Sequence, residues 1–119
     1  MTFLDSSLAL LVSLPRNDVA LAEAAIGAGA DGIKTHVNVH HRAGGTRFGS
    51  VAEERAELER IVALGVPTGL VIGGEGQVRR AEIDAGRSLG FAFFDVYLSH
   101  APAWYVDACG SVPAVAAVG

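Results

Sequence analysis

Short apolar runs alternate with amphipathic stretches along most of this chain. The apolar runs predict buried strands, and the stretches in which apolar residues recur every three or four positions predict helices between them. Alternating helices and apolar strands favour an α/β fold, in which helices cover a parallel sheet. The expected strands are 8–13, 32–39, 66–73, 91–98 and 112–118, and the expected helices are 19–28, 51–64, 77–89 and 103–109.

Capping residues mark the starts of two of these helices. Ser50 and Glu53 form the S-x-x-E pattern of a capping box, in which each side chain satisfies a free backbone N–H of the other residue. Before the first helix, either Asn17 or Asp18 can supply the capping oxygen. Gly65 follows the second helix, as expected where a helix ends.

Two expected strands carry polar side chains on one face only. Side chains alternate between the faces of a strand, so Lys34, His36 and Asn38 share a face of the strand 32–39. By the same rule Asp95 and Tyr97 share a face of the strand 91–98. Polar rows of this kind, aimed inward near the carboxyl ends of parallel strands, are typical of the catalytic mouth of a (β/α)8 barrel.

The barrel is therefore preferred over a doubly wound open sheet, whose central strands are apolar on both faces. A whole barrel needs about 250 residues, and the 119 residues here supply about four and a half units. We expect a single domain over 1–119 that corresponds to the N-terminal half of a TIM barrel, truncated at the fifth strand. The alternative is a natural half-barrel that covers its open edges by forming a homodimer.

Composition and charge argue against some classes of binding partner and some cellular locations. The net charge of −4 leaves no basic footprint, so nucleic-acid binding is not expected. The apolar run 8–12 is too short to span a membrane and lacks the basic residues that precede it in a signal peptide. The single cysteine, Cys109, cannot form an internal disulfide and suits a reduced compartment. The expected location is the cytoplasm, without membrane contact.

Lys34 is the first candidate catalytic residue. A lysine that is desolvated inside a barrel can act as a base or an amine nucleophile, and it can also hold a carboxylate or phosphate as a cation. With Asp95 it would form an acid/base pair two strands apart. The alternative is a buried ion pair with Asp95 or Glu75. His36 could transfer protons or bind a metal ion, or it could be a hydrogen-bonded core histidine.

The segments that follow the expected strands add candidate binding residues. Arg42 and Arg47 suit bidentate capture of a phosphate or carboxylate. Glu75, in a glycine-rich turn, is a candidate acid/base or metal-binding carboxylate. Asn38 would orient a substrate oxygen, and Tyr97 and His100 would contact the substrate from the rim of the site. The adjacent His40 and His41 point apart in an extended chain and form only a weak metal signal.

The segment Gly29–Ser50 resembles the ribulose-phosphate-binding group of (β/α)8 barrels, most nearly the ribulose-phosphate 3-epimerases. Those enzymes carry G-A-D-x-x-H-x-D-V followed by T-F-G-P; this chain has Gly29-Ala30-Asp31, then His36-Val37-Asn38-Val39, then Thr46-Arg47-Phe48-Gly49. The resemblance implies a barrel, with His36 as a metal ligand and Asn38 at the acid/base position. The strand-three histidine of the family has no counterpart in 66–73.

These observations predict an enzyme of the lyase or isomerase type. Its substrate would be a small anionic carbonyl or sugar-phosphate compound, and its chemistry would be acid/base transfer by Lys34 with Asp95 or Glu75. The sequence does not identify a cofactor, and the candidate is a divalent metal ion bound by His36 and Glu75. The alternative is a catalytically inactive half-barrel fragment or a dimerising binding module.

Overall fold

The computed structural model describes residues 8–41 and 45–118, and its centre is a parallel sheet of five strands. The strands follow one another across the sheet in the order β1-β2-β5-β6-β7, and each neighbouring pair is parallel. The expected α/β fold is confirmed. The strand bounds are β1 (Leu11–Ser13), β2 (Gly32–His36), β5 (Thr68–Val71), β6 (Phe93–Tyr97) and β7 (Ala114–Ala117).

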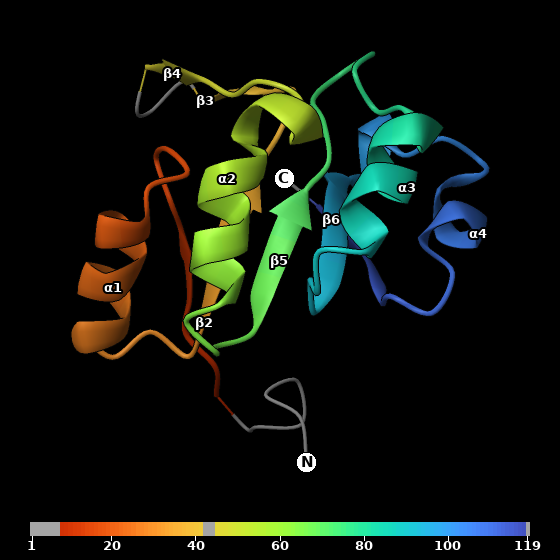
Figure 1. Cartoon of the computed structure of the whole chain (residues 1–119). Helices are drawn as coiled ribbons and strands as arrows, with labels where there is room; N and C mark the ends of the chain where they lie inside the picture. The colour runs from red at the N-terminus through yellow and green to blue at the C-terminus, as the bar shows by residue number, and fades with distance from the viewer. Residues whose placement is uncertain (1–7, 42–44, 119) are drawn as a thin grey trace.

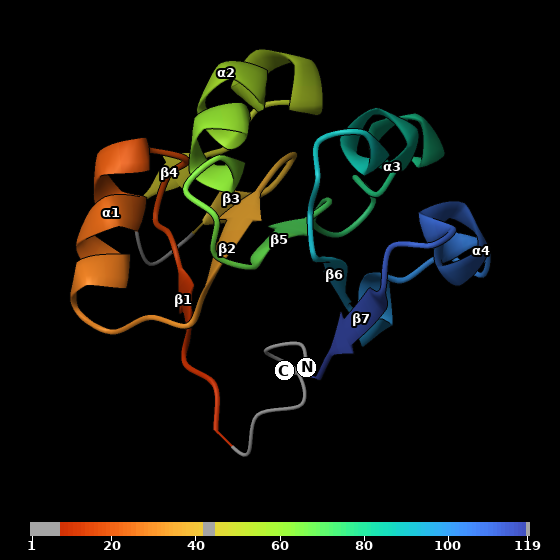
Figure 2. The ribbon, with the colours of Figure 1, turned by 60° about the horizontal axis from the view of Figure 1, so that its bottom comes forward.

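One helix lies in each connection between neighbouring strands of this sheet. Because the strand order never reverses and crossovers are right-handed, all the helices fall on one side of the sheet (Figure 1). Figure 2 shows the strands as an arc with the helices outside it. The described strands thus lack the reversal that defines a doubly wound sheet. The helices are α1 (Val19–Gly27), α2 (Val51–Val62), α3 (Arg80–Arg87) and α4 (Tyr105–Cys109).

The helix starts follow the capping residues. The Asp18 side chain accepts a hydrogen bond from the Ala20 backbone N–H at 2.8 Å, so Asp18, and not Asn17, caps α1. The capping box between Ser50 and Glu53 is present at the start of α2. The longest helix, α2, has 12 residues, and within the described ranges no helix has both the length and the apolarity to cross a bilayer.

The face of the sheet toward the helices, called the outer face here, carries the hydrophobic core. Ile33 packs with Ala22 of α1 and Ile61 of α2 in one cluster. Leu70 and Phe94 belong to a second cluster with side chains of α2, α3 and α4. The outer face therefore supplies the apolar burial that stabilises the sheet.

The opposite face, called the inner face here, carries the alternate residues. Lys34 and His36 of β2, Val71 of β5 and Asp95 of β6 lie on it and line one hollow. None of the helices in the described ranges lies on this side (Figure 2). Period-two alternation thus divides the strands into an apolar side and a side with charged residues, as the sequence predicts.

Every expected strand and helix is shorter in the structure, and one expected loop contains strands. β2 ends at His36, because Asn38 adopts a left-handed φ of 52° that leaves the extended region. β6 ends at Tyr97 and continues as a 3₁₀ turn through His100. The segment 40–49, expected as a loop, contains an antiparallel hairpin, and α3 begins at Arg80, three residues later than expected. The hairpin strands are β3 (His40–His41) and β4 (Thr46–Arg47).

Candidate functional site

A hollow of about 1140 Å³ opens at the carboxyl ends of the strands, on the inner face. The hairpin β3–β4 and the turn after β5 form parts of its wall, because both follow directly from strand ends. Arg42, predicted as a binding residue, lies outside the described residues. All the other predicted site residues line the hollow: Lys34, His36, Asn38, Arg47, Glu75, Asp95, Tyr97 and His100.

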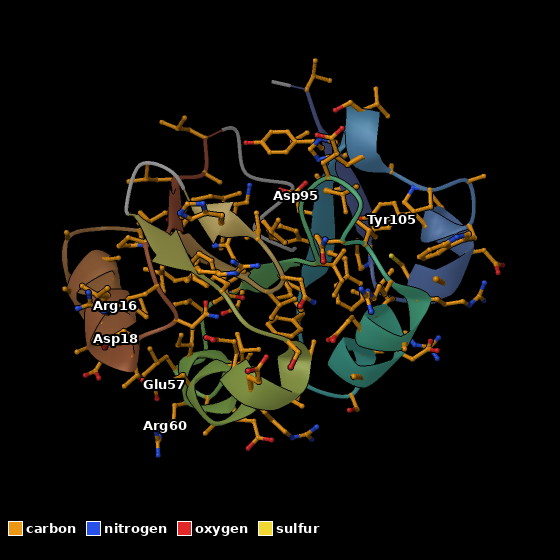
Figure 3. The ribbon with its side chains drawn as sticks, turned by 90° about the horizontal axis from the view of Figure 1, so that it is seen from above. Arg16, Asp18, Glu57, Arg60, Asp95 and Tyr105 are labelled. Atoms are coloured by element: carbon orange, nitrogen blue, oxygen red, sulfur yellow. The ribbon has the colours of Figure 1, made fainter. Side chains whose placement is uncertain are left out.

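Lys34 and Asp95 form an ion pair across the inner face. Lys34 Nζ lies 2.6 Å from Asp95 Oδ2, although β5 separates their two strands. The Asp95 side chain is 5% exposed and that of Lys34 is 25% exposed, so the ammonium reaches the hollow and the carboxylate is buried beneath it. The pairing partner of Lys34 is therefore Asp95 and not Glu75. Figure 3, which looks onto this end of the strands, shows Asp95 on the side away from α2.

Gly69 makes room for the Phe93 ring beside Lys34. It lies beside Lys34 in the β2–β5 register and beside Phe93 in the β5–β6 register. A Cβ atom on Gly69 would overlap the Phe93 ring. Glycine is required at this position because the aromatic ring covers the strand there, and any side chain would push the ring away.

His36 is fixed on three sides. Its Nε2 lies 3.2 Å from Ser13 Oγ, and its ring stacks on Phe48 with 4.9 Å between the ring centroids. The side-chain amide of Asn17 accepts from the His36 backbone N–H at 3.2 Å and donates to its carbonyl at 2.7 Å. His36 is thus a buried, hydrogen-bonded histidine that also lines the hollow.

Asn17 is a site-forming residue that the sequence reasoning missed. After Ser13, the Leu14 backbone N–H still donates to the Lys34 carbonyl at 3.0 Å, and the Asn17 amide takes the next place along β2, beside His36. Asn17 Nδ2 also donates to Glu54 Oε1 at 2.9 Å, and Glu54 Oε2 accepts from the Gly49 backbone N–H at 3.2 Å. This network fixes the end of β2 and the return of the hairpin. The only sequence signal was a polar residue next to the actual helix cap.

Asn38 lies beyond the end of β2, so a turn of the backbone, and not the alternation of side chains along the strand, brings it to the hollow. Its N–H donates to the Gly49 carbonyl at 2.9 Å, and its carbonyl accepts from the Gly74 N–H at 3.1 Å. Asparagine tolerates the left-handed conformation better than most residues. These two backbone bonds hold Asn38 between the hairpin and the turn after β5.

The rim of the hollow carries exposed polar groups. Arg47 is exposed, and its side chain forms no ion pair with any residue that the structure describes. Glu75 is exposed in the turn after β5, and Tyr97 is half exposed with His100 edge-on at 5.7 Å between ring centroids. Glu53 also lines the hollow. Its carboxylate accepts a hydrogen bond from the Ser50 backbone N–H, which lowers the pKa of Glu53, so this side chain is an ionised part of the helix cap.

A metal site is not supported by the geometry. Within residues 8–41 and 45–118, no three His, Cys, Asp or Glu side chains come close enough to hold a metal ion. The assignment of His36 and Glu75 as metal ligands stays a prediction, and no step below depends on it.

Tyr105 and Cys109 belong to the core and not to the site. Both pack into the cluster on the outer face, and the Tyr105 hydroxyl donates to the Val115 carbonyl at 2.9 Å. Burial raises the pKa of the Tyr105 phenol and of the Cys109 thiol. Both groups are therefore neutral near pH 7 and remain structural.

No family model, curated protein or solved structure matches the chain. The hollow itself and the arrangement of the strands that form it therefore carry the functional assignment below.

Proposed function

We propose that this chain belongs to the (β/α)8-barrel pattern and carries the catalytic half of a lyase- or isomerase-type site for a small anionic carbonyl or sugar-phosphate compound. The observation that carries the proposal is the ion pair between Lys34 and Asp95 in a hollow at the carboxyl ends of parallel strands. In barrel enzymes this end of the strands holds the catalytic residues. Sequential strand order with all helices on one side supports the same pattern.

The groups in the hollow suit proton transfer next to a carbonyl. The Lys34 ammonium has three N–H donors, and Asp95 occupies one of them, so the ammonium can also polarise a carbonyl oxygen. Asp95, or Glu75 at the rim, would accept and return the proton. His36 and Asn38 would bind substrate oxygens, and the exposed guanidinium of Arg47 would hold a phosphate or carboxylate.

Deuterium incorporation tests this proposal whatever the final product of the reaction is. Proton abstraction next to a carbonyl exchanges that proton with solvent, which ¹H NMR in D₂O detects. We expect the protein to accelerate exchange in dihydroxyacetone phosphate or glyceraldehyde 3-phosphate above the buffer rate. Lys34→Ala should reduce the enzymatic part of this rate at least about a hundredfold, as expected for loss of a transition-state donor.

The matched control is Arg55→Ala. Arg55 is an exposed cation on α2, where it pairs with Glu59 at 2.7 Å, outside the hollow. This variant should keep the full exchange rate. Exchange at the buffer rate with folded wild-type protein, or an unchanged rate in folded Lys34→Ala, would overturn the proposal.

A dimerising half-barrel is the second candidate function. Exposed apolar side chains lie near both outer strands of the sheet, with Leu10 and Leu11 at β1 and Leu98 and Val118 near the end of β7. Open edges of parallel sheets associate readily. A dimer would give a doubled mass in sedimentation, and Leu10→Lys with Val118→Lys would convert it to a monomer. A wild-type monomer at all accessible concentrations would exclude this function.

A further inference from the structure

Unpartnered polar atoms gather at the hollow. Three of its lining residues, Asn38, Asp95 and His100, each carry a buried side-chain atom without a hydrogen-bond partner in the described part of the chain. The atoms are Asn38 Nδ2, Asp95 Oδ1 and His100 Nδ1. Most buried polar groups in folded proteins are satisfied, so three unsatisfied ones around one hollow indicate groups arranged for a ligand.

Among the described residues, the carboxylate of Asp95 has a partner for only one of its two oxygens. Lys34 binds Oδ2, whereas Oδ1 accepts no hydrogen bond from residues 8–41 or 45–118, although Asp95 is only 3% exposed. An ionised carboxylate accepts hydrogen bonds and donates none, so Oδ1 requires a donor. Asp95 lines the hollow, so a ligand bound there lies next to its carboxylate.

The side-chain amide of Asn38 lacks a hydrogen-bond acceptor in the described part of the chain. Its Nδ2 is a donor and requires an oxygen acceptor. The free N–H donors of Lys34 also require acceptors, because this ammonium contacts one carboxylate oxygen. A ligand that satisfies all these groups carries at least one oxygen acceptor and one hydrogen-bond donor, and in a sugar-phosphate or similar carbonyl compound that donor is a hydroxyl.

We infer that Asp95 determines specificity by accepting a hydrogen bond from a ligand hydroxyl through Oδ1, and that Lys34 positions Asp95 by holding Oδ2. This inference rests on the proposed function and narrows its substrate class. The ligand is a hydroxyl-bearing carbonyl compound with an anionic group, and a carbonyl compound that lacks the hydroxyl binds less well. In this arrangement the positive charge of Lys34 orients Asp95, and the Lys34 amine does not act as a nucleophile.

Two probes that differ by one hydroxyl test the inference. Dihydroxyacetone phosphate has a hydroxyl next to its carbonyl, and hydroxyacetone phosphate (acetonyl phosphate) has a hydrogen atom in that position. Titration calorimetry with the wild-type protein should give a Kd about tenfold or more lower for dihydroxyacetone phosphate, as expected for a hydrogen bond to a charged acceptor. Asp95→Asn should reduce this ratio to less than about threefold.

Asp84→Asn is the matched control, because it makes the same chemical change at an exposed carboxylate of α3 outside the hollow. It should keep the wild-type ratio of affinities. A second measurement does not require the Asp95 variant to fold. Lys34 is the only lysine of the chain, so ¹⁵Nζ-lysine labelling gives one side-chain signal. We expect dihydroxyacetone phosphate to shift it more than hydroxyacetone phosphate does.

The outcomes separate the two claims. If both probes bind with equal affinity and shift the Lys34 signal equally, the hydroxyl inference is wrong and the proposed anionic site stands. If neither probe binds, both the inference and the proposed function are overturned. If borohydride with dihydroxyacetone phosphate adds mass to Lys34, the lysine is a nucleophile and its assignment as a positioning residue is wrong.

Discussion

On the outer face of the sheet, Ile33, Leu70 and Phe94 are fully buried among apolar side chains, whereas on the inner face Lys34 and Asp95 hold each other by an ion pair. The same strands provide both sets, since neighbouring residues point to opposite faces. The outer face gains its stability from removing apolar surface from water. The inner face must compensate every charge that it buries, so each polar residue there depends on a partner.

The two faces of the sheet should therefore respond differently to substitution. Loss of a side chain on the outer face leaves a cavity, and its effect grows with the volume removed. Loss of one side chain on the inner face leaves its partner unsatisfied, and a second substitution can restore the balance. The following predictions test this contrast.

Phe94→Ala should have the largest effect. Phe94 is fully buried and its ring centroid lies 6.2 Å from that of Phe91. Truncation should lower the free energy of unfolding by about 4 kcal/mol, which urea denaturation measures. Val106→Ala, at a side chain that is 70% exposed, should change it by less than about 0.5 kcal/mol. Similar losses in the two variants would contradict the assignment of the core to the outer face.

Lys34→Met should follow, with a loss of about 3 kcal/mol, because it leaves the Asp95 carboxylate buried without its cation. The double variant Lys34→Met with Asp95→Leu removes both charges and should recover most of this stability. If the double variant were less stable than Lys34→Met, the inner face would not depend on charge compensation. Chemical denaturation of the wild type and these two variants measures both changes in the free energy of unfolding.

Asn17→Ala should lower stability by about 2 kcal/mol, because it leaves the His36 backbone groups and Glu54 without a partner. The backbone amide signals of His36 and Gly49 should shift together in ¹⁵N NMR spectra, since one network connects them. Asp18→Ala is the comparison, because it removes the neighbouring helix cap and leaves this network intact. A local shift at residue 17 alone would show that the network does not position His36.

Ser50→Ala should have the smallest effect on the free energy of unfolding, about 1 kcal/mol, through loss of half of the capping box. Urea denaturation measures it.

The other half of the capping box, the Glu53 side chain, makes the stability of the fold depend on pH. Its pKa is lowered below the usual 4.5 in the folded protein, so the unfolded chain binds this proton more readily. Its contribution is present above pH 4.5 and is lost as the pH falls through the folded pKa. Glu53→Gln should therefore flatten the acid side of the stability profile, and an unchanged profile would exclude this linkage.

Period-two alternation explains why so much of the site could be predicted. Lys34, His36 and Asp95 lie within regular strands, where parity alone assigns each side chain to a face. The sequence also predicted the pairing of Lys34 with Asp95 as one of two alternatives. Strand order and helix placement followed from the alternation of elements.

The remainder could not be predicted because it depends on contacts between distant segments. Asn38 leaves the strand, so its place in the hollow comes from backbone bonds to Gly49 and Gly74 and not from parity. Asn17 contacts His36, which lies 19 residues along the chain, and no local pattern reports such a contact. The hairpin over 40–49 consists of two-residue strands, too short to show a period of their own.

The sequential strand order has a consequence for how the molecule is made. Each strand of the main sheet pairs with the next one that the chain supplies, so every pairing can form as soon as one further strand and helix have been synthesised. Pairing each strand with the next one closes shorter loops than pairing strands further apart in the chain would, so the entropy lost at each step is smaller. Assembly can thus proceed from the N-terminal strand onward while the ribosome is still at work. The pair of Lys34 and Asp95, which spans three strands, would be completed only after the fourth strand of the sheet has emerged.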